Sequence, residues 1–391
     1  MPLPRGPVPV EGDGRADGAA PPGRHRAPVR RQALVQWTLT ALVLGATGAA
    51  ALRSGDAIGQ AMTRLRSVGP ASLAALLTCW AVSSASRGWA VALSVPGLSV
   101  RRGVMAAEAV TGIGNALPGG VAIGQTIRIA MCRSWGAAAS QIVLSFLTTG
   151  TVTMSVLWLL ALAALAPELG GGRAGPGEWG AAALGVVIVG GAAAAWAGAL
   201  TEPVFSLVRG PALRVVERLG RRVWPAGTRA GDELEELRRA GRRMWRRRGV
   251  ALAAAGLGYQ LGLAAVLLSA LRTVDTAGLS SWDAFRSFAL VRAATWLVPT
   301  PGGLGAVDAG LTAALVDAGA APPDAIAAVL LYRAVTFVLP ILTGLACSSL
   351  WRLQQRRADK RPGDGGPAQS RRTPGPERGP QHGDDRPAPA R

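Results

Sequence analysis

Long apolar runs alternate with short stretches rich in glycine, proline and charge along most of the 391-residue chain. Six of these runs reach about 20 residues, the length of helix that crosses roughly 30 Å of hydrocarbon. The pattern therefore predicts an all-α, polytopic membrane protein with six full spans. The predicted spans cover residues 33–52, 70–94, 139–166, 179–200, 250–271 and 325–350.

Two further apolar segments, residues 102–137 and 281–320, differ from the spans because each is interrupted by Pro-Gly-Gly. Each segment has two charged arms of roughly 16–18 residues, a little short for an upright crossing. We interpret them as re-entrant helical hairpins, since broken backbone at membrane depth is tolerated inside protein or beside a water-filled cavity. Two short full spans in each segment, and so eight or more spans in total, are the alternative.

The second hairpin contains "LVPTPGGLGAVDAG", residues 297–310. Pro301 ends the first arm because proline has no N–H, and the glycines allow positive φ and close backbone approach. The next arm begins near Leu304, and a carboxylate at Asp308, in about the first turn, suits the helix dipole. The unpaired N–H groups there would also hold a phosphate or carboxylate. The alternative is that Asp308 is only a structural charge at the helix start. The glycines concerned are Gly302, Gly303 and Gly305.

The first hairpin contains "GNALPGGVAIGQTIR", residues 114–128. Its break consists of Pro118, Gly119 and Gly120. Asn115 can satisfy backbone groups that the break frees. Gln125 and Arg128 lie three residues apart, on one face of the second arm. Arg128 either contributes to a polar site or snorkels to the cytoplasmic surface.

Three arginines, Arg87, Arg292 and Arg333, lie inside the apolar segments. Ionisable groups at membrane depth are costly and usually face a cavity or a charged partner. Candidate partners are Glu108 for Arg87 and Asp308 for either of the other two. Paired arginines would be structural, whereas unpaired ones would line a site for an anionic headgroup.

Basic residues concentrate in three regions of a chain whose formal net charge is +19. The arm 1–31 has six arginines against three acids, the loop 201–249 has 13 against six, and the tail 352–391 has ten basic residues against five acids. Excess Lys and Arg stays cytoplasmic. We therefore expect a multi-pass protein of the cell membrane with both termini and this loop inside. The basic segment 53–69 disagrees, because the same topology places it outside.

The order span–hairpin–span occurs twice. Pro118 and Pro301 are 183 residues apart (301 − 118), and this offset carries the second and third spans onto the fifth and sixth. The two halves are predicted to have inverted topology, with hairpins entering from opposite faces, an architecture found in transporters. The predicted domains are a disordered arm (1–31), the integral membrane domain (32–352) and a disordered tail (353–391). The repeat halves cover about 33–166 and 179–350.

The loop 201–249 ends in "RAGDELEELRRAGRRMWRRRG". Leu234, Leu237 and Met244 with their flanking arginines predict a short surface helix beside anionic lipids. Nucleic acid is not an expected partner, because the basic charge follows membrane topology.

Catalytic and metal-binding side chains are sparse. The three cysteines lack CxxC spacing, and both histidines, His25 and His382, lie in the polar tails. We expect no metal, no cofactor, no catalytic residue and no enzyme activity. A membrane glycosyl- or acyltransferase would require an acidic pair or a histidine at the membrane surface. The only adjacent aspartates, Asp384 and Asp385, lie in the tail.

Three stretches together resemble the flippase-like integral membrane domain of the lysylphosphatidylglycerol synthase family: "NALPGGVAIGQTIRIAMCRSWG", "TPGGLGAVDAGL" and "LLYRAVTFVLPILTGL". The Arg-Gly-Trp at 87–89 is similar to the arginine–tryptophan feature of the family's second span. The resemblance covers about residues 33–350. It implies a bacterial membrane protein, in a family of which some members move aminoacylated phospholipids between leaflets, and it gives weight to the pair Tyr332–Arg333.

The chain departs from the family pattern in two ways. Fused members carry a soluble aminoacyl-transfer domain after the membrane part, whereas this sequence continues into a polar tail, so we do not expect it to make the lipid. Many members have an acidic residue where this chain has Gln125, which argues against a proton- or cation-linked role there.

We therefore predict a flippase-like transporter that moves a phospholipid or lipid-linked headgroup between leaflets of the cytoplasmic membrane. The alternatives are a glycosyl- or acyltransferase acting on a lipid-linked substrate, or a non-transporting scaffold. The sequence leaves homo-oligomer formation open. The predicted headgroup site consists of Arg87, Asn115, Pro118, Gly119, Gly120, Gln125, Arg128, Arg292, Pro301, Gly302, Gly303, Gly305, Asp308, Tyr332 and Arg333.

Overall fold

Helices form every regular element in the part of the chain that the structure, a computed structural model, describes. The all-α prediction is confirmed for these residues. The predicted first span at 33–52 lies outside them. The described residues are 55–66, 68–117, 120–172, 175–200, 230–276, 278–295 and 305–359.

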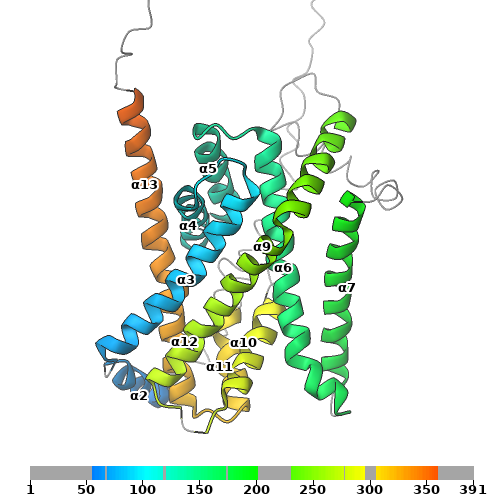
Figure 1. The fold of residues 1–391 in the computed structure, drawn as a ribbon. Helices are drawn as coiled ribbons and strands as arrows, with labels where there is room; N and C mark the ends of the chain where they lie inside the picture. The colour runs from blue at the N-terminus through cyan, green and yellow to red at the C-terminus, as the bar shows by residue number, and fades with distance from the viewer. Residues whose placement is uncertain are drawn as a thin grey trace, which may run out of the picture. The chain divides into compact units, whose positions relative to one another are not determined.

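Figure 1 shows the order of the helices along the chain. The first group is α2 (Gly55–Arg66), α3 (Pro70–Ser94), α4 (Val100–Ala116), α5 (Gly120–Ser134), α6 (Ala139–Gly170) and α7 (Pro176–Leu200). The second group is α9 (Ala230–Thr273), α10 (Ser281–Thr295), α11 (Ala306–Asp317), α12 (Pro322–Arg333), a π-helical turn (Ala334–Val338) and α13 (Leu339–Asp359).

Four stretches of helix in the described residues are long and apolar enough to cross a membrane. They coincide with the predicted third to sixth spans. A fifth is counted only if α3 is joined to the preceding Gly59–Arg66, from which it is bent by 95°. The four are Ala139–Gly170, Pro176–Ala194, Glu235–Thr273 and Pro322–Arg357.

Both predicted hairpins form as pairs of packed helices, α4 with α5 and α10 with α11. The four arms have 17, 15, 15 and 12 residues. At 1.5 Å per residue these helices are about 18–25 Å long, less than the roughly 30 Å of hydrocarbon in a bilayer. In the second hairpin the described part of α10 runs to Thr295, and α11 begins at Ala306 directly after Gly305.

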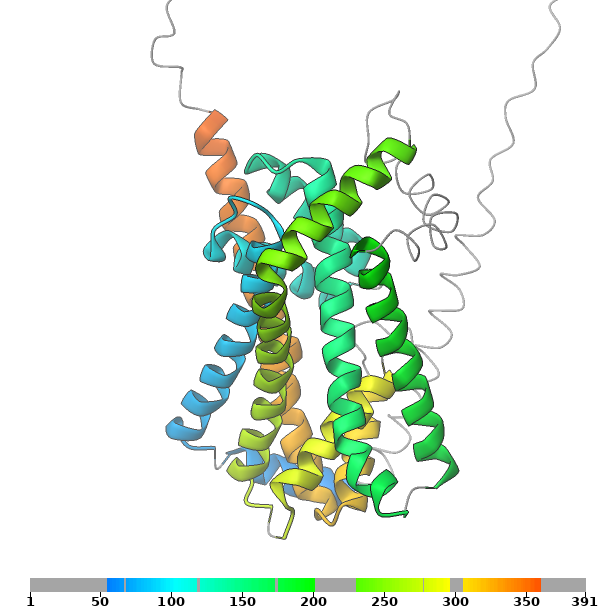
Figure 2. The ribbon, with the colours of Figure 1, turned by 45° about the vertical axis from the view of Figure 1, so that its right-hand side comes forward.

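The antiparallel packing of α3 against α9 places the two hairpins at opposite ends of the long helices (Figures 1 and 2). Near the start of α4, Arg248 of α9 donates a 2.9 Å hydrogen bond to the Leu93 carbonyl. Towards the other end, a Cβ on Gly262 would lie 2.9 Å from the Ser83 Cα. The first hairpin therefore adjoins the start of the apolar part of α9, and the second hairpin follows its end.

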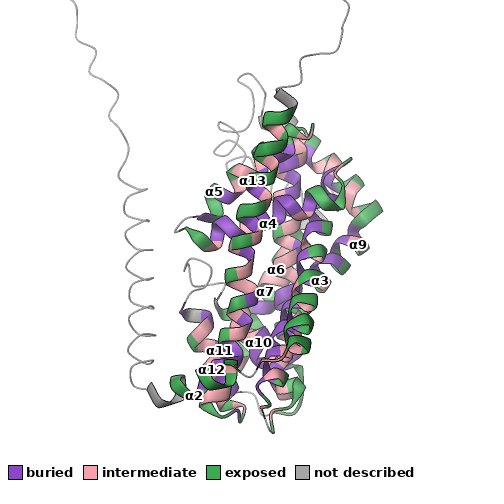
Figure 3. Cartoon of the chain, turned by 90° about the vertical axis from the view of Figure 1, so that its left-hand side faces the viewer, coloured by how far each residue is buried: buried purple, intermediate pink, exposed green. Residues whose placement is uncertain are grey.

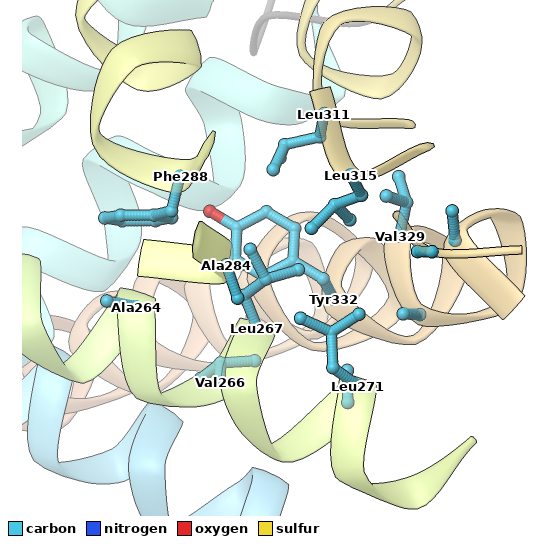
Figure 4. Close-up of a cluster of buried hydrophobic side chains, with 14 of the residues drawn as sticks. Ala264, Val266, Leu267, Leu271, Ala284, Phe288, Leu311, Leu315, Val329 and Tyr332 are labelled. Atoms are coloured by element: carbon cyan, nitrogen blue, oxygen red, sulfur yellow. The ribbon is translucent and has the colours of Figure 1, made fainter. Parts of the chain in front are cut away.

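The main hydrophobic core lies around the second hairpin. Tyr332 is 1% exposed and packs edge-on to Phe288, with ring centroids 6.4 Å apart. Leucines from α9 and α11 surround the tyrosine ring (Figure 4). Large apolar side chains on the outer faces of the long helices are exposed (Figure 3), as expected for surfaces that meet lipid.

The predicted short surface helix in the basic loop is wrong. Residues from Ala230 onward belong to α9, a single 44-residue helix that continues into the apolar span. Leu237 is buried, and Met244 packs against the cluster around Leu252. Arginine, leucine and alanine all favour helix, so the change from charged to apolar residues at Val250 does not end it. Contact with anionic lipids stays a prediction.

Candidate headgroup site

Glu108 in α4 is the centre of a buried hydrogen-bond network and is 2% exposed. Its Oε1 accepts hydrogen bonds from Ser84 Oγ at 2.6 Å and from Arg87 Nη2 at 2.5 Å. Its Oε2 accepts one from Thr343 Oγ1 at 2.7 Å. Both carboxylate oxygens are therefore engaged, and one buried anion joins α3, α4 and α13.

Arg87 approaches Glu108 from α3, so this predicted ion pair is present. Its other terminal nitrogen donates to the Thr111 hydroxyl. The guanidinium carbon lies 5.5 Å from the ring centroid of Tyr259 in α9, within cation–π range. The sequence predicted the carboxylate partner of Arg87 but not the ring.

Arg128 in α5 is a buried cation, 5% exposed, with no carboxylate partner among the described residues. Its Nη2 donates to Ser145 Oγ of α6, and that hydroxyl also lies 2.6 Å from Ser94 Oγ. The guanidinium carbon is 4.6 Å from the ring centroid of Phe146. Cys132 of α5 is a further neighbour of this guanidinium, and the Nε–H has no hydrogen-bond partner in the part of the chain that the structure describes. Burial between helices argues against a guanidinium that snorkels to the surface.

The two amide side chains of the first hairpin have different surroundings. The Gln125 Oε1 atom is buried one turn before Arg128, and no described residue donates a hydrogen bond to it. Asn115 Nδ2 donates to the Phe337 carbonyl at 3.2 Å. That carbonyl belongs to the π-helical turn before Pro340, so Asn115 satisfies irregular backbone in the last span. Sequence reasoning expected Asn115 to serve the break in its own hairpin.

Gly120 starts α5 under close contact, because a Cβ there would lie 2.0 Å from the Ile113 carbonyl oxygen of α4. Glycine is required at this position for the two arms to meet. The other residues of the two Pro-Gly-Gly breaks lie outside the described residues, so their predicted roles are not tested. They are Pro118, Gly119, Pro301, Gly302 and Gly303.

Asp308 stands at the start of α11 as predicted. Gly305 precedes the helix with φ of +77°, and its N–H donates to Asp308 Oδ2 at 2.9 Å. Arg333 of α12 binds both carboxylate oxygens, Nε to Oδ1 and Nη2 to Oδ2, the latter at 3.2 Å. Asp308 therefore pairs with Arg333 rather than with Arg292. The two side chains are 27% and 13% exposed.

Arg292 in α10 lies beside both tyrosines of the chain. Tyr259 is its hydrogen-bonding neighbour, and Tyr332 interacts with it electrostatically. Since the Tyr259 ring also faces Arg87, this one side chain lies between arginines from the two halves. Tyr332, predicted as a site residue, is mainly a core residue whose hydroxyl points towards Phe288 (Figure 4).

The site contains several polar residues that sequence reasoning missed. They sit inside runs that read as uniformly apolar, where small hydroxyls carry little signal. Tyr259 had one usable signal, because the whole chain contains only two tyrosines and both lie in predicted spans. The missed residues are Ser84, Ser94, Thr111, Ser145, Tyr259 and Thr343.

The fold is that of a multi-pass, all-helical membrane protein with ionisable side chains inside it. The family model described as "Lysylphosphatidylglycerol synthase TM region" matches residues 34–344. The chain belongs to this family through its membrane region. No curated protein matches the chain.

Proposed function

We propose that this protein is a lipid transporter of the flippase-like kind, which moves a phospholipid or lipid-linked headgroup between the leaflets of the cell membrane. The observation that carries the proposal is the placing of two short helical hairpins at opposite ends of the long helices, each with an intramembrane arginine–carboxylate pair. Broken elements with polar interiors are tolerated where they line a path for polar groups.

The charge of the interior supports a phosphate-bearing substrate. Four arginines, Arg87, Arg128, Arg292 and Arg333, lie on the hairpins and the helices beside them, with two carboxylates, Glu108 and Asp308. Arginine is the side chain best suited to phosphate, because its planar donors match two oxygens at once. The proposal involves no bond making or breaking, so the protein acts as a carrier and not as an enzyme.

Inverted halves would give the two hairpins equal and opposite roles. The offset of 183 residues (301 − 118) carries residues 70–94 of α3 to 253–277, largely within α9, and α5 largely onto α11. This topology keeps residues 33–52 as the predicted first of six spans. Both termini are then cytoplasmic, and the arginine-rich start of α9 stays inside as the positive-inside rule requires.

Leaflet exchange is the direct test of transport. The purified protein would be reconstituted with acyl-labelled fluorescent phospholipids, and the labelled lipid still protected from dithionite would be followed over time. We expect exchange faster than in empty liposomes and slowed by Arg333→Gln, with Arg239→Gln as a control because Arg239 is 69% exposed. No acceleration with any of several headgroups would overturn the proposal.

Cysteine labelling tests the topology separately, in a cysteine-free background. Exposed positions at the base of the first hairpin, Pro96 and Ala138, should label only from the cytoplasmic side when each is changed to cysteine. Exposed positions at the base of the second hairpin, Ser281 and Ala321, should label only from outside. Labelling of the two members of a pair from different faces would show that the hairpin crosses the membrane.

A further inference from the structure

Arg128 has bonding capacity that the protein does not use. A guanidinium carries five N–H donors, and at neutral pH it stays charged. Arg128 donates to the hydroxyl of Ser145 and has the weakly polar thiol of Cys132 beside it, and its buried Nε–H has no hydrogen-bond partner among the described residues. Leaving a charged donor buried and unsatisfied is costly, so a site of this kind is best explained by a partner that the protein alone does not supply.

No carboxylate within the described residues neutralises this cation. Glu108 is the buried acid of the described residues, and its oxygens accept hydrogen bonds from Ser84, Arg87 and Thr343. Arg87 lies close enough to Arg128 for the two positive charges to repel each other. The first hairpin therefore keeps one uncompensated positive charge beside α6.

We propose that Arg128 binds the phosphate of a lipid headgroup with net negative charge and sets the specificity of the transporter for anionic over aminoacylated, cationic lipids. This inference rests on the proposed function and names its substrate class. A phosphate offers two oxygens to the terminal and Nε donors of one guanidinium. A cationic amine near the same place would face Arg87 and Arg128 without a free carboxylate, and such repulsion is an effective means of discrimination.

Gln125 adds a second polar contact one turn away. Its amide oxygen is buried on the same face of α5 as Arg128 and has no partner among the described side chains and backbone groups. An amide oxygen accepts from a hydroxyl, so the pair fits a phosphate with a neighbouring hydroxyl, as in a glycerol or sugar headgroup. The amide carries no negative charge that would attract an amine.

The packing of α5 gives the headgroup a way to reach Arg128. The helix packs closely on α4, where Gly124 approaches the Val110 backbone, and it touches α6 only lightly. Ser145 and Phe146 of α6 cover the guanidinium in this conformation. Separation of α5 from α6 would expose the cation while leaving the α4–α5 hairpin intact.

The test compares two lipids that differ in headgroup charge. Liposomes would contain acyl-labelled phosphatidylglycerol, which is anionic, or acyl-labelled lysylphosphatidylglycerol, which is cationic, with labelled phosphatidylcholine as a reference. We expect the wild-type protein to exchange the anionic lipid about tenfold faster than the cationic one, the ratio that about 1.4 kcal/mol of discrimination gives. Arg128→Gln should bring the ratio close to one, and Arg128→Lys should restore most of it.

Arg101→Gln is the matched control, because Arg101 is an exposed arginine at the start of α4. It changes net charge by the same amount and should leave the ratio unchanged. A structural role of Arg128 would lower the thermal stability of Arg128→Gln without altering the headgroup ratio. Equal exchange of both lipids by the wild type, or an unaltered ratio in Arg128→Gln, overturns the inference.

A binding measurement separates this inference from the proposed function. Native mass spectrometry of the purified full chain would be titrated with each lipid, and with inorganic phosphate as a competitor. We expect phosphatidylglycerol to bind at about tenfold lower concentration than the lysylated lipid, with little displacement by phosphate. Selective binding without exchange would refute transport but keep the site. Displacement by phosphate at equal concentration would show that the site takes the free anion and not the lipid.

Discussion

The two hairpins contain similar charged residues but carry the carboxylate on different arms. Each brings a carboxylate that pairs with an arginine on a neighbouring long helix, and each carries one further arginine. In the first hairpin the acid is Glu108 on the first arm, and in the second it is Asp308 on the second arm. The repeat offset carries Asp308 onto Gln125 (308 − 183), so the second arm of the first hairpin has an amide where the other has a charge.

The difference extends to packing. Glu108 is buried and bonded to three side chains, whereas the Asp308 side chain is 27% exposed and bonded to one arginine and one backbone N–H. A Cβ added to Gly124 of the first hairpin would contact the backbone of Val110. A Cβ added to Gly310 of the second hairpin would contact only the side chain of Val291. The comparison indicates a first hairpin whose acid is fully buried and whose arms are tightly packed, and a second hairpin that is more open to solvent.

The largest expected effect is the loss of Glu108. Glu108→Ala leaves Arg87 without a carboxylate in the interior, and breaking a buried pair in this way costs about 3–5 kcal/mol. Asp308→Ala should cost less, about 2 kcal/mol, because water reaches that pair. Thermal and denaturant unfolding of the detergent-solubilised protein measures both. Glu236→Ala, at an exposed position, should change stability by less than about 0.5 kcal/mol. A greater loss from Asp308→Ala would reverse the comparison.

The glycines give the next largest effect. A Cβ on Gly124 would lie 2.8 Å from the Val110 carbonyl oxygen, so Gly124→Ala must push α4 and α5 apart, at about 1–3 kcal/mol. A Cβ on Gly310 would lie 3.0 Å from a methyl group of Val291, which can move, so Gly310→Ala should cost under about 1 kcal/mol.

Gly150 provides the control for both glycines, because a Cβ there has no atom within 4 Å. Gly150→Ala should be neutral or stabilise α6 by up to about 1 kcal/mol, the difference in helix propensity. The same unfolding curves report all three variants. If Gly124→Ala and Gly310→Ala are equally well tolerated, the first hairpin is not the tighter of the two.

Replacing Gln125 by aspartate should give the second arm of the first hairpin a carboxylate, as Asp308 gives the second arm of the second hairpin. Gln125→Asp places a carboxylate one turn from Arg128, at the position equivalent to Asp308. We expect the preference for phosphatidylglycerol over its lysylated form to fall about tenfold, because the new charge compensates the arginine. The leaflet-exchange assay measures the ratio, and Gln125→Asn, which adds no charge, is the control. If the ratio of the two exchange rates is unchanged in Gln125→Asp, the charge of this hairpin does not determine which headgroup is transported.

The sequence patterns predicted the two hairpins but missed several of the polar contacts inside them. Pro-Gly-Gly between short charged arms marks a helix break by steric necessity, so the break is legible from residue types alone. The pairing of Arg87 with Glu108 follows from the cost of burying charge. The contact of Asn115 with Phe337 depends on how the last span meets α4, more than 200 residues away, and no local pattern encodes it. The sequence patterns did not predict that α9 is one continuous helix. Hydropathy shows where a segment enters the membrane, but a helix can continue across that boundary.

The smallest predicted effect concerns Tyr259, which lies between the arginines of the two halves. Tyr259→Phe keeps the ring facing Arg87 and removes the hydroxyl beside Arg292, so it should cost about 1 kcal/mol of stability, the usual net value of a hydrogen bond. Tyr259→Leu also removes the cation–π contact and should cost about 0.5–1 kcal/mol more. Unfolding curves of the two variants, with the exposed Trp179→Phe as control, measure the difference. If both variants lose the same free energy of unfolding, then only the hydroxyl beside Arg292 contributes to stability, and the contact of the ring with Arg87 does not.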